Sequence, residues 1–544
     1  MKRGRQVKPI DPGAIGDHLM ALAIPLVLGM ASLGGVVMAS LRAAKLRWTW
    51  ALWGVPVACL SWPIDWQVGV ALFSATAVAA GWGAYWHWED LERGGEQARE
   101  ARDRVSPLRW AWSRWRGKRA RESRIEDGKL ALGTLKRGGV CRVPVGLERG
   151  VHAFVIGATG AGKTVTQSAI AQAYILAGLP AIVLDPKGDR YLRAVLKDAA
   201  ERAGARFIEW SPTGPSVYNP FGRGGPTEVA DKALAGHRWS EPHYELATQR
   251  LLGHVLKTMQ AANHWPPTLS EIVAFMDPER LDSLACGAGG EVAQRVAAYV
   301  DSLSARGKAD LGGGRDRLAV LVESELGRWL DPSLNDGPAL NFAESLKRGD
   351  VVYMHIDADR YPAASKLLGA ALVIDLVTLT ADLHGRNTRG LVVIDEFAAL
   401  AAEQVHRLFG RARSAGLSVV LGTQSLADLR SARPDDATDT LTEQVLTNIE
   451  FAVIHRESDP DSAERLARVA GTKQSWSTTR RVSGAPGMAG LGDGTRTAER
   501  EFWVAPDEFK RLGTGEAVVI EPAQKHPAEI VEIWGPGPGA HQTG

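Results

Sequence analysis

The sequence predicts an α/β fold in which a mostly parallel sheet is covered by helices on both faces. The first observation is a series of short apolar runs, rich in Val and Ile, that are separated by helix-like stretches. These runs lie at 152–156, 181–185, 205–210, 351–356, 391–395, 418–421 and 450–454. The second observation is a long helical interval within the series, and the third is a pair of uncharged segments near the N-terminus. Two further candidate strands, 517–521 and 529–533, are expected to close the sheet near the C-terminus.

The composition gives only weak constraints on partners. The chain of 544 residues is long enough for two or three domains, and its formal net charge is +2. No global field therefore directs it to nucleic acid. The three cysteines (Cys59, Cys141 and Cys286) are far apart and lack zinc-ligand spacing, which indicates a reducing compartment and no disulfide framework.

Two uncharged segments predict a membrane anchor over residues 1–90. As helices, 19–41 and 66–86 are each long enough to cross a hydrocarbon core of about 30 Å. Eleven of the 18 tryptophans precede residue 116, many of them near the ends of these segments, where interfacial anchors are found. The apolar segment 48–64 is shorter and contains two prolines, so it is expected to be interfacial or part of the outer loop.

Basic residues predict how the anchor is oriented. Four Lys/Arg precede the first segment, and nine lie within 102–124. Both flanks therefore favour the cytoplasm, which predicts a multi-pass hairpin with the following domains in the cytoplasm. Residues 91–130 are expected to form a basic juxtamembrane segment, in which 102–124 is a helix that lies against anionic lipid headgroups, with contact to nucleic acid as the alternative.

Residues 157–164 read Gly-Ala-Thr-Gly-Ala-Gly-Lys-Thr and follow the first apolar run directly. This matches the P-loop pattern between a strand and a helix, which binds a nucleoside triphosphate through backbone N–H groups. Lys163 is expected to reach the outer phosphates, and the hydroxyl of Thr164 to ligate Mg²⁺. The predicted cofactors are ATP and Mg²⁺. The predicted binding residues are Gly157, Ala158, Thr159, Gly160, Ala161, Gly162, Lys163 and Thr164.

A second motif completes the expected ATPase. The apolar run 391–394 ends in Asp395 and Glu396, as a Walker B strand does. We expect Asp395 to hold Mg²⁺, directly or through water, and Glu396 to orient and polarise the attacking water.

Two further catalytic candidates lie near the next strand. Gln424 follows the run 418–421, and adjacent parallel strands end at the same crevice, so it is a candidate sensor of the γ-phosphate or of the attacking water. The alternative is an exposed loop amide. Arg411 and Arg413 precede this strand, and either could be an arginine finger that reaches a neighbouring subunit's nucleotide, with Arg413 favoured.

The spacing of the two motifs predicts an insertion. Thr164 and Asp395 are 231 positions apart, whereas a compact P-loop core needs on the order of a hundred. The excess lies at 225–345, where helical periodicity prevails, and predicts an inserted all-α domain. The nucleotide-binding domain is then expected at 131–224 and 346–535, followed by a disordered tail at 536–544.

Several motifs together resemble the type IV secretion coupling proteins, the TraG/TraD-like conjugation ATPases. The resemblance covers residues 150–535 and rests on GATGAGKT, Leu184-Asp-Pro-Lys-Gly-Asp189, Tyr218-Asn-Pro-Phe221, Ile394-Asp-Glu-Phe-Ala-Ala-Leu400, Arg413-Ser-Ala-Gly-Leu-Ser-Val-Val420 and Gly422-Thr-Gln-Ser-Leu426. It implies a RecA-like P-loop ATPase in the bacterial inner membrane that forms a homo-hexameric ring. It further implies that the chain brings a relaxase–DNA complex to a type IV secretion channel and drives single-stranded DNA or protein substrates through it.

The sequence leaves several alternatives open. The chain could be a related ring-forming DNA pump, or a non-motor adaptor in which ATP binding gates the recruitment of protein cargo. The segment 474–500 contains Trp476, Arg480 and Arg481, which suit a nucleic-acid-facing loop, although a surface hairpin with no ligand fits equally well. Whether DNA or protein is the main substrate stays open.

Overall fold

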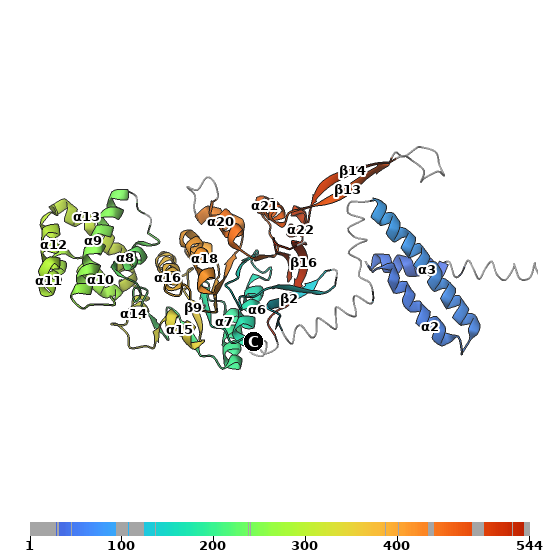
Figure 1. Ribbon diagram of the computed structural model, residues 1–544, viewed down its shortest axis with the longest axis horizontal. Helices are drawn as coiled ribbons and strands as arrows, with labels where there is room; N and C mark the ends of the chain where they lie inside the picture. The colour runs from blue at the N-terminus through green and yellow to red at the C-terminus, as the bar shows by residue number, and fades with distance from the viewer. Residues whose placement is uncertain are drawn as a thin grey trace, which may run out of the picture. The chain divides into compact units, whose positions relative to one another are not determined.

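Figure 1 shows the computed structural model of the chain. It describes residues 29, 32–44, 46–93, 107, 124–136, 138–237, 239, 241–386, 388–400, 402–432, 440–480, 494–524 and 526–537. The chain divides into two compact units, which are described separately below. Unit 1 comprises residues 1–118, 135–139 and 472–501, and unit 2 comprises 119–134, 140–471 and 502–544.

The N-terminal part of unit 1 is helical. It contains a helix at Ser32–Ala43, a short 3₁₀ helix η1 (Trp48–Trp53), α2 (Gly54–Ser61) and the long α3 (Trp66–Arg93). Met38, Ala51, Ala79 and Ala80 form a small core between these elements. The segment 48–64 is largely helical, and η1 and α2 pack against α3, whereas its predicted place at the membrane interface or in the outer loop stays a prediction.

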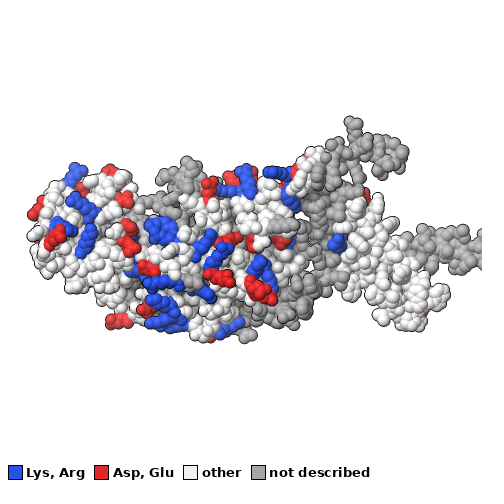
Figure 2. Space-filling model, viewed as in Figure 1, with Lys and Arg blue, Asp and Glu red and all other residues white. Residues whose placement is uncertain are grey.

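The predicted membrane spans are described to different extents. The second, 66–86, lies within α3, whose stretch Trp66–Asp90 is long and apolar enough to cross a membrane. Most of the first, 19–41, lies outside the described residues, so the two-span hairpin stays a prediction. Another helix of sufficient length, α16 (Pro362–Asp382), has 83% of its most apolar window buried and is a core helix of unit 2. Figure 2 shows few charged side chains on the visible face of the N-terminal helices.

Unit 1 also contains a two-stranded sheet of β13 (Thr472–Arg480) and β14 (Gly494–Phe502). The side chains of Trp476 and Arg480, and all of Arg481, lie outside the described residues. Most of the basic segment 91–130 and residues 538–544 of the predicted tail also lie outside them.

Unit 2 is built on a 12-stranded sheet with the order β1-β2-β16-β15-β12-β4-β11-β10-β5-β9-β6, in which β3 also pairs with β2. The seven strands from β12 to β6 are parallel to their neighbours, whereas β15 and β16 add antiparallel pairs. The strands are β1 (Ile125–Glu126), β2 (Lys129–Leu135), β3 (Val140–Pro144), β4 (His152–Ile156), β5 (Ala181–Asp185), β6 (Phe207–Trp210), β9 (Val351–His355), β10 (Gly390–Ile394), β11 (Leu417–Thr423), β12 (Phe451–Ile454), β15 (Glu516–Ile520) and β16 (Ala528–Ile533). The predicted mostly parallel α/β sheet is confirmed, and each predicted run is a strand. The antiparallel β1–β3 were not predicted.

Helices pack against the sheet and against one another. α6 contacts β4, β5, β10 and β11, and α18 contacts β11 and α16. Besides α16, the described helices of unit 2 outside the inserted region are α6 (Lys163–Leu176), α7 (Arg190–Ala203), α15 (Phe342–Arg348), α17 (Phe397–Leu400), α18 (Ala402–Ala415), α19 (Leu426–Ala432), α20 (Thr440–Asn448), α21 (Pro460–Ala470) and α22 (Pro506–Lys510).

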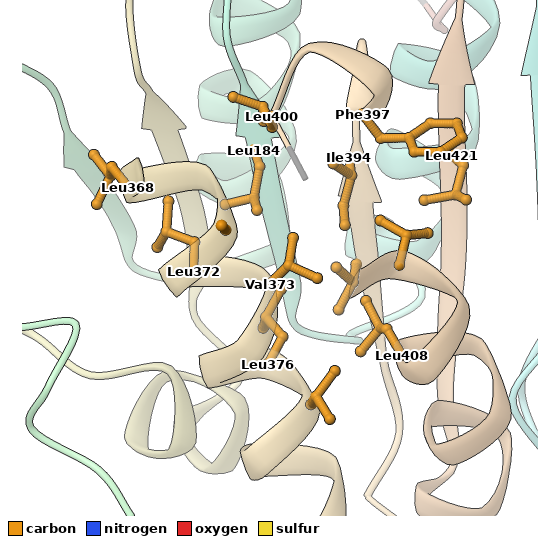
Figure 3. Close-up of a cluster of buried hydrophobic side chains, with 14 of the residues drawn as sticks. Leu184, Leu368, Leu372, Val373, Leu376, Ile394, Phe397, Leu400, Leu408 and Leu421 are labelled. Atoms are coloured by element: carbon orange, nitrogen blue, oxygen red, sulfur yellow. The ribbon is translucent and has the colours of Figure 1, made fainter. Parts of the chain in front are cut away.

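The core beside the nucleotide strands is formed by α16. Figure 3 shows Leu368, Leu372, Val373 and Leu376 of this helix facing Leu184, Ile394 and Leu421 at the ends of β5, β10 and β11. All seven side chains are buried, with exposed fractions of no more than 1%. Complete burial of one aliphatic side chain contributes about 1.5–3 kcal/mol, so this cluster stabilises the packing of α16 against the sheet.

A run of helices lies between β6 and β9 in the sequence, although these two strands pair with each other in the sheet. Two short parallel strands, β7 (Val217–Tyr218) and β8 (Ala339–Leu340), flank it. The helices are α8 (Pro226–Leu234), α9 (Pro242–Ala261), α10 (Leu269–Phe275), α11 (Pro278–Ala288), α12 (Gly290–Asp301), α13 (Ala305–Glu323) and α14 (Gly327–Leu330). Their pairing around α9 is visible in Figure 1. The domain boundaries given above remain predictions.

A buried ion pair joins this helical region to the nucleotide-binding core. Lys232 of α8 lies 2.6 Å from Asp375 of α16, and its side chain is fully buried. Lys232 also donates to the carbonyl oxygen of Arg223 at 2.8 Å, and the hydroxyl of Tyr218 donates to the other oxygen of Asp375 at 2.8 Å. Burial raises the pKa of Tyr218, so its hydroxyl remains a donor.

Candidate nucleotide-binding site

The P-loop forms a turn between β4 and α6. Gly160 and Gly162 have φ angles of 77° and 119°, a left-handed region that strains residues with a side chain. The backbone N–H groups of Gly160, Gly162, Lys163 and Thr164 have no hydrogen-bond partner within the described part of the chain. Because they lie at the start of a helix, where the dipole is positive, they form a site for an anion such as a phosphate.

His455 packs against the P-loop at Gly157. A Cβ atom at Gly157 would lie 2.7 Å from the Cβ of His455, so the close approach requires glycine at 157. The His455 ring lies 2.8 Å from the Thr166 hydroxyl through Nε2 and 3.1 Å from the Glu516 carbonyl oxygen through Nδ1. Burial lowers the pKa of His455 to about 4, so the ring is neutral. A carbonyl only accepts, so Nδ1 carries the proton and Nε2 accepts from Thr166.

This burial predicts acid sensitivity. The folded chain keeps His455 neutral, whereas the unfolded chain takes up a proton below about pH 6.5. Stability is therefore lost as the pH falls from about 6.5 towards 4, and His455 alone contributes a loss of about 2 kcal/mol between pH 7 and 5. The free energy of unfolding is measured from denaturant curves at pH 7 and pH 5. We expect His455→Asn to reduce the difference between these two free energies by about 2 kcal/mol. The exposed His243→Asn is the control and should leave the difference unchanged; an equal effect of both variants would contradict the prediction.

The two predicted acidic residues lie beside the P-loop lysine. Asp395 and Glu396 follow β10 and are 4% and 6% exposed. The Lys163 ammonium lies 3.1 Å from Asp395 Oδ1 and also contacts Glu396 Oε1. Gln167 donates to Asp395 Oδ1 at 3.1 Å. The structure thus brings Lys163, at the start of α6, next to Asp395 and Glu396, which follow β10 and are distant from it in the sequence.

The backbone at these acids is unusual. Glu396 has a φ angle of 43°, which is rare for a residue with a side chain and is found most often at functional sites. Gly422, on the neighbouring β11, has no room for a side chain, because a Cβ atom there would lie 2.5 Å from Asp395 Oδ1. The tight fit holds the Asp395 carboxylate in one place.

The oxygen ligands present suit Mg²⁺ bound together with a nucleotide. The Thr164 hydroxyl at the start of α6 and the Asp395 carboxylate are hard oxygen donors. Among the residues that the structure describes, no group of three or more His, Cys, Asp or Glu side chains could hold a metal ion by itself. Mg²⁺ commonly uses one or two protein oxygens and completes its shell with phosphates and water, so this donor set fits.

Lys187 is a site residue to which the sequence assigned no role. It follows β5 in the motif Asp185-Pro-Lys-Gly-Asp189, and its ammonium lies 3.1 Å from Glu396 Oε1. His455 was also missed. In both cases the available signal is the position directly after the end of a parallel strand, where site residues gather.

The remaining two candidates lie in different places. Gln424 is half-buried, and its amide oxygen accepts from the Thr159 hydroxyl of the P-loop at 3.3 Å. Arg413 lies 2.6 Å from Glu450, which also accepts from the backbone N–H of His152 at the start of β4. The P-loop follows the other end of β4, so Arg413 lies at the opposite edge of the sheet from this site. Its role in a neighbouring subunit's site stays a prediction.

Comparison with protein families decides the class. Residues 328–533, which contain Asp395, Glu396 and Gln424, match the family model described as the type IV secretion-system coupling protein DNA-binding domain. This part of the chain is a type IV secretion coupling-protein domain. Residues 144–210, which contain the P-loop, match the helicase HerA-like C-terminal model. The predicted recognition is confirmed for residues 328–533, and the chain is an ATP hydrolase of the P-loop class, as the motifs predict.

Solved structures of a bacterial conjugative coupling protein, TrwB, have the same fold. The unbound form of TrwBdeltaN70 has a TM-score of 0.54 at 18% identity and covers 77% of this chain and 91% of its own. TrwB with the non-hydrolysable analogue ADPNP and TrwB with ADP and Mg²⁺ have TM-scores of 0.52 and 0.53, at 18% identity. Each covers 78% of this chain and 94% of its own. No curated protein matches the chain.

Proposed function

We propose that this coupling-protein chain is a membrane-anchored ATPase that brings a relaxase–DNA substrate to a type IV secretion channel and drives single-stranded DNA transfer. The observation that carries the proposal is the buried pair Asp395–Glu396, which lies within the coupling-protein domain and contacts the P-loop lysine. An adaptor that only binds ATP has no need for a second buried acid beside the first.

ATP with Mg²⁺ supplies the phosphoanhydride bond whose hydrolysis drives the transfer; TrwB binds the corresponding analogue and ADP with Mg²⁺. In this chain Lys163 and the free N–H groups of the P-loop hold the phosphates. Thr164 and Asp395 hold the ion, and Glu396 orients the attacking water. Gln424, which the Thr159 hydroxyl contacts, responds to the outer phosphate or to that water.

The anchor and the ring complete the proposal. In unit 1 large apolar side chains are exposed, among them Leu60 at 74% and Ile64 at 87%, which suits contact with lipid in the inner membrane. We also propose that the first predicted span, 19–41, crosses the membrane, so that both flanks and the ATPase lie in the cytoplasm. A homo-hexamer lets Arg413 or Arg411 approach a neighbour's nucleotide.

The full-length chain in detergent should hydrolyse ATP faster when single-stranded DNA is added. A translocase holds the phosphate backbone without reading sequence, so stimulation should be similar for unrelated sequences. It should also fall steeply between about 50 and 200 mM salt, because the contacts release counterions. ATP turnover is measured at each salt concentration with and without DNA. If ATP turnover were unchanged by DNA at every salt concentration, a protein substrate or the adaptor alternative would be favoured.

A further inference from the structure

Two lysines share one carboxylate oxygen in the candidate site. Lys163 and Lys187 both contact Glu396 Oε1, and the Lys187 ammonium lies 3.1 Å from it. They come from different elements, since Lys163 begins α6 and Lys187 follows β5. Lys163 has a second partner in Asp395 at 3.1 Å, whereas Glu396 is the one ion-pair partner of Lys187 among the described residues. The proposed function assigns a role to Lys163 but none to Lys187.

The loop that carries Lys187 is held rigidly by a buried carboxylate. Asp185 is completely buried and accepts from the backbone N–H groups of Lys187, Gly188 and Asp189 at 2.9, 3.0 and 2.7 Å. The hydroxyl of Tyr353 donates to the same carboxylate at 2.8 Å, and burial raises the pKa of Tyr353, so this donor stays protonated. Three N–H bonds and a hydroxyl therefore fix the backbone from which the Lys187 side chain extends.

The two lysines respond differently to a bound triphosphate. Lys163 lies in the P-loop, whose free N–H groups and lysine bind phosphates. A bound triphosphate therefore competes with Glu396 for the Lys163 ammonium. Lys187 lies outside the P-loop and keeps its contact. The Glu396 side chain is only 8% exposed, and a buried carboxylate that loses its partners is costly and is no longer held in one rotamer.

We propose that Lys187 is a positioning residue that holds the Glu396 carboxylate in place for the attacking water once Lys163 has moved to the phosphates. This inference rests on the proposed ATPase function. Lys187 acts through Glu396 and makes no contact with the nucleotide, which separates it from the residues that bind phosphate.

The test compares full-length variants in detergent. Lys187→Met should lower kcat by about 10-fold or more, because a misplaced base loses part of its effect of roughly 10²–10⁴-fold. Lys187→Arg should recover most of kcat, since the cation is restored. The matched control is Lys197→Met, which removes an exposed lysine from α7 and should behave as wild type. Thermal unfolding midpoints of Lys187→Met and Lys197→Met should agree.

Binding is measured where turnover is blocked. In the Glu396→Gln background, adding Lys187→Met should leave the Kd of a fluorescent ATP analogue within about 2-fold, because Lys187 is expected not to touch phosphate. A 10-fold weaker Kd would show a direct phosphate contact and overturn the proposal, as would a kcat of Lys187→Met equal to that of Lys197→Met. A wild-type chain without ATP turnover would instead refute the proposed function.

Discussion

Glu396→Gln should lower ATP turnover by about 10²–10⁴-fold while ATP binding is retained. The amide keeps the size of the side chain and its contact with Lys163, but it cannot accept a proton from the attacking water. Lys163, Thr164 and Asp395 remain in place, so the groups that hold phosphate and Mg²⁺ are unchanged. Turnover is measured as phosphate release, and binding as the Kd of a fluorescent ATP analogue.

The matched control is Glu457→Gln, which replaces another buried carboxylate. Glu457 is 2% exposed and accepts from the backbone N–H of Asp459, outside the P-loop. Its replacement should leave turnover near the wild-type value. If DNA transfer survived Glu396→Gln, hydrolysis would not drive the transfer, and the adaptor alternative would replace the motor.

The parts of the site that the sequence predicts are those whose functional residues are consecutive in the chain. Eight consecutive residues form the P-loop, and Asp395 and Glu396 directly follow one buried strand. The contact between Lys163 and Glu396 follows once both motifs are assigned to one parallel sheet, because parallel strands end at a common edge.

The parts that were missed depend on contacts between distant segments. Lys187 and Glu396 are 209 positions apart, and Thr166 and His455 are 289 apart. Single residues after a strand carry no pattern that distinguishes a structural loop from a site. A lysine or a histidine becomes informative only when the strand order places it beside another motif.

The fold shows a similar limit. Periodicity predicted the strands of the parallel sheet and the helical interval, but α2 was not predicted within 48–64, a short segment that contains two prolines. Pro56 is the third residue of α2, where a missing N–H costs no intrahelical hydrogen bond. β1–β3 were missed because their antiparallel pairing lies outside the α/β pattern of the rest.

Lys232→Met should destabilise the fold by about 3–5 kcal/mol, the cost expected when one partner of a buried ion pair is removed. Methionine fills a similar volume, so the loss comes from Asp375, which is left charged and 4% exposed. Arg223 lies 3.6 Å from Asp375 but is too far for a hydrogen bond and replaces the lost contact poorly. The free energy of unfolding is measured from denaturant curves in detergent.

The double variant Lys232→Met/Asp375→Asn separates charge from packing. If the cost of Lys232→Met is the uncompensated charge on Asp375, removing that charge should recover part of the loss, so the two substitutions should not be additive. Lys257→Met, at an exposed position of α9, should change stability by no more than about 0.5 kcal/mol. A loss for Lys232→Met as small as that of Lys257→Met would mean that water reaches Asp375, and the pair would then not fasten α8 to α16.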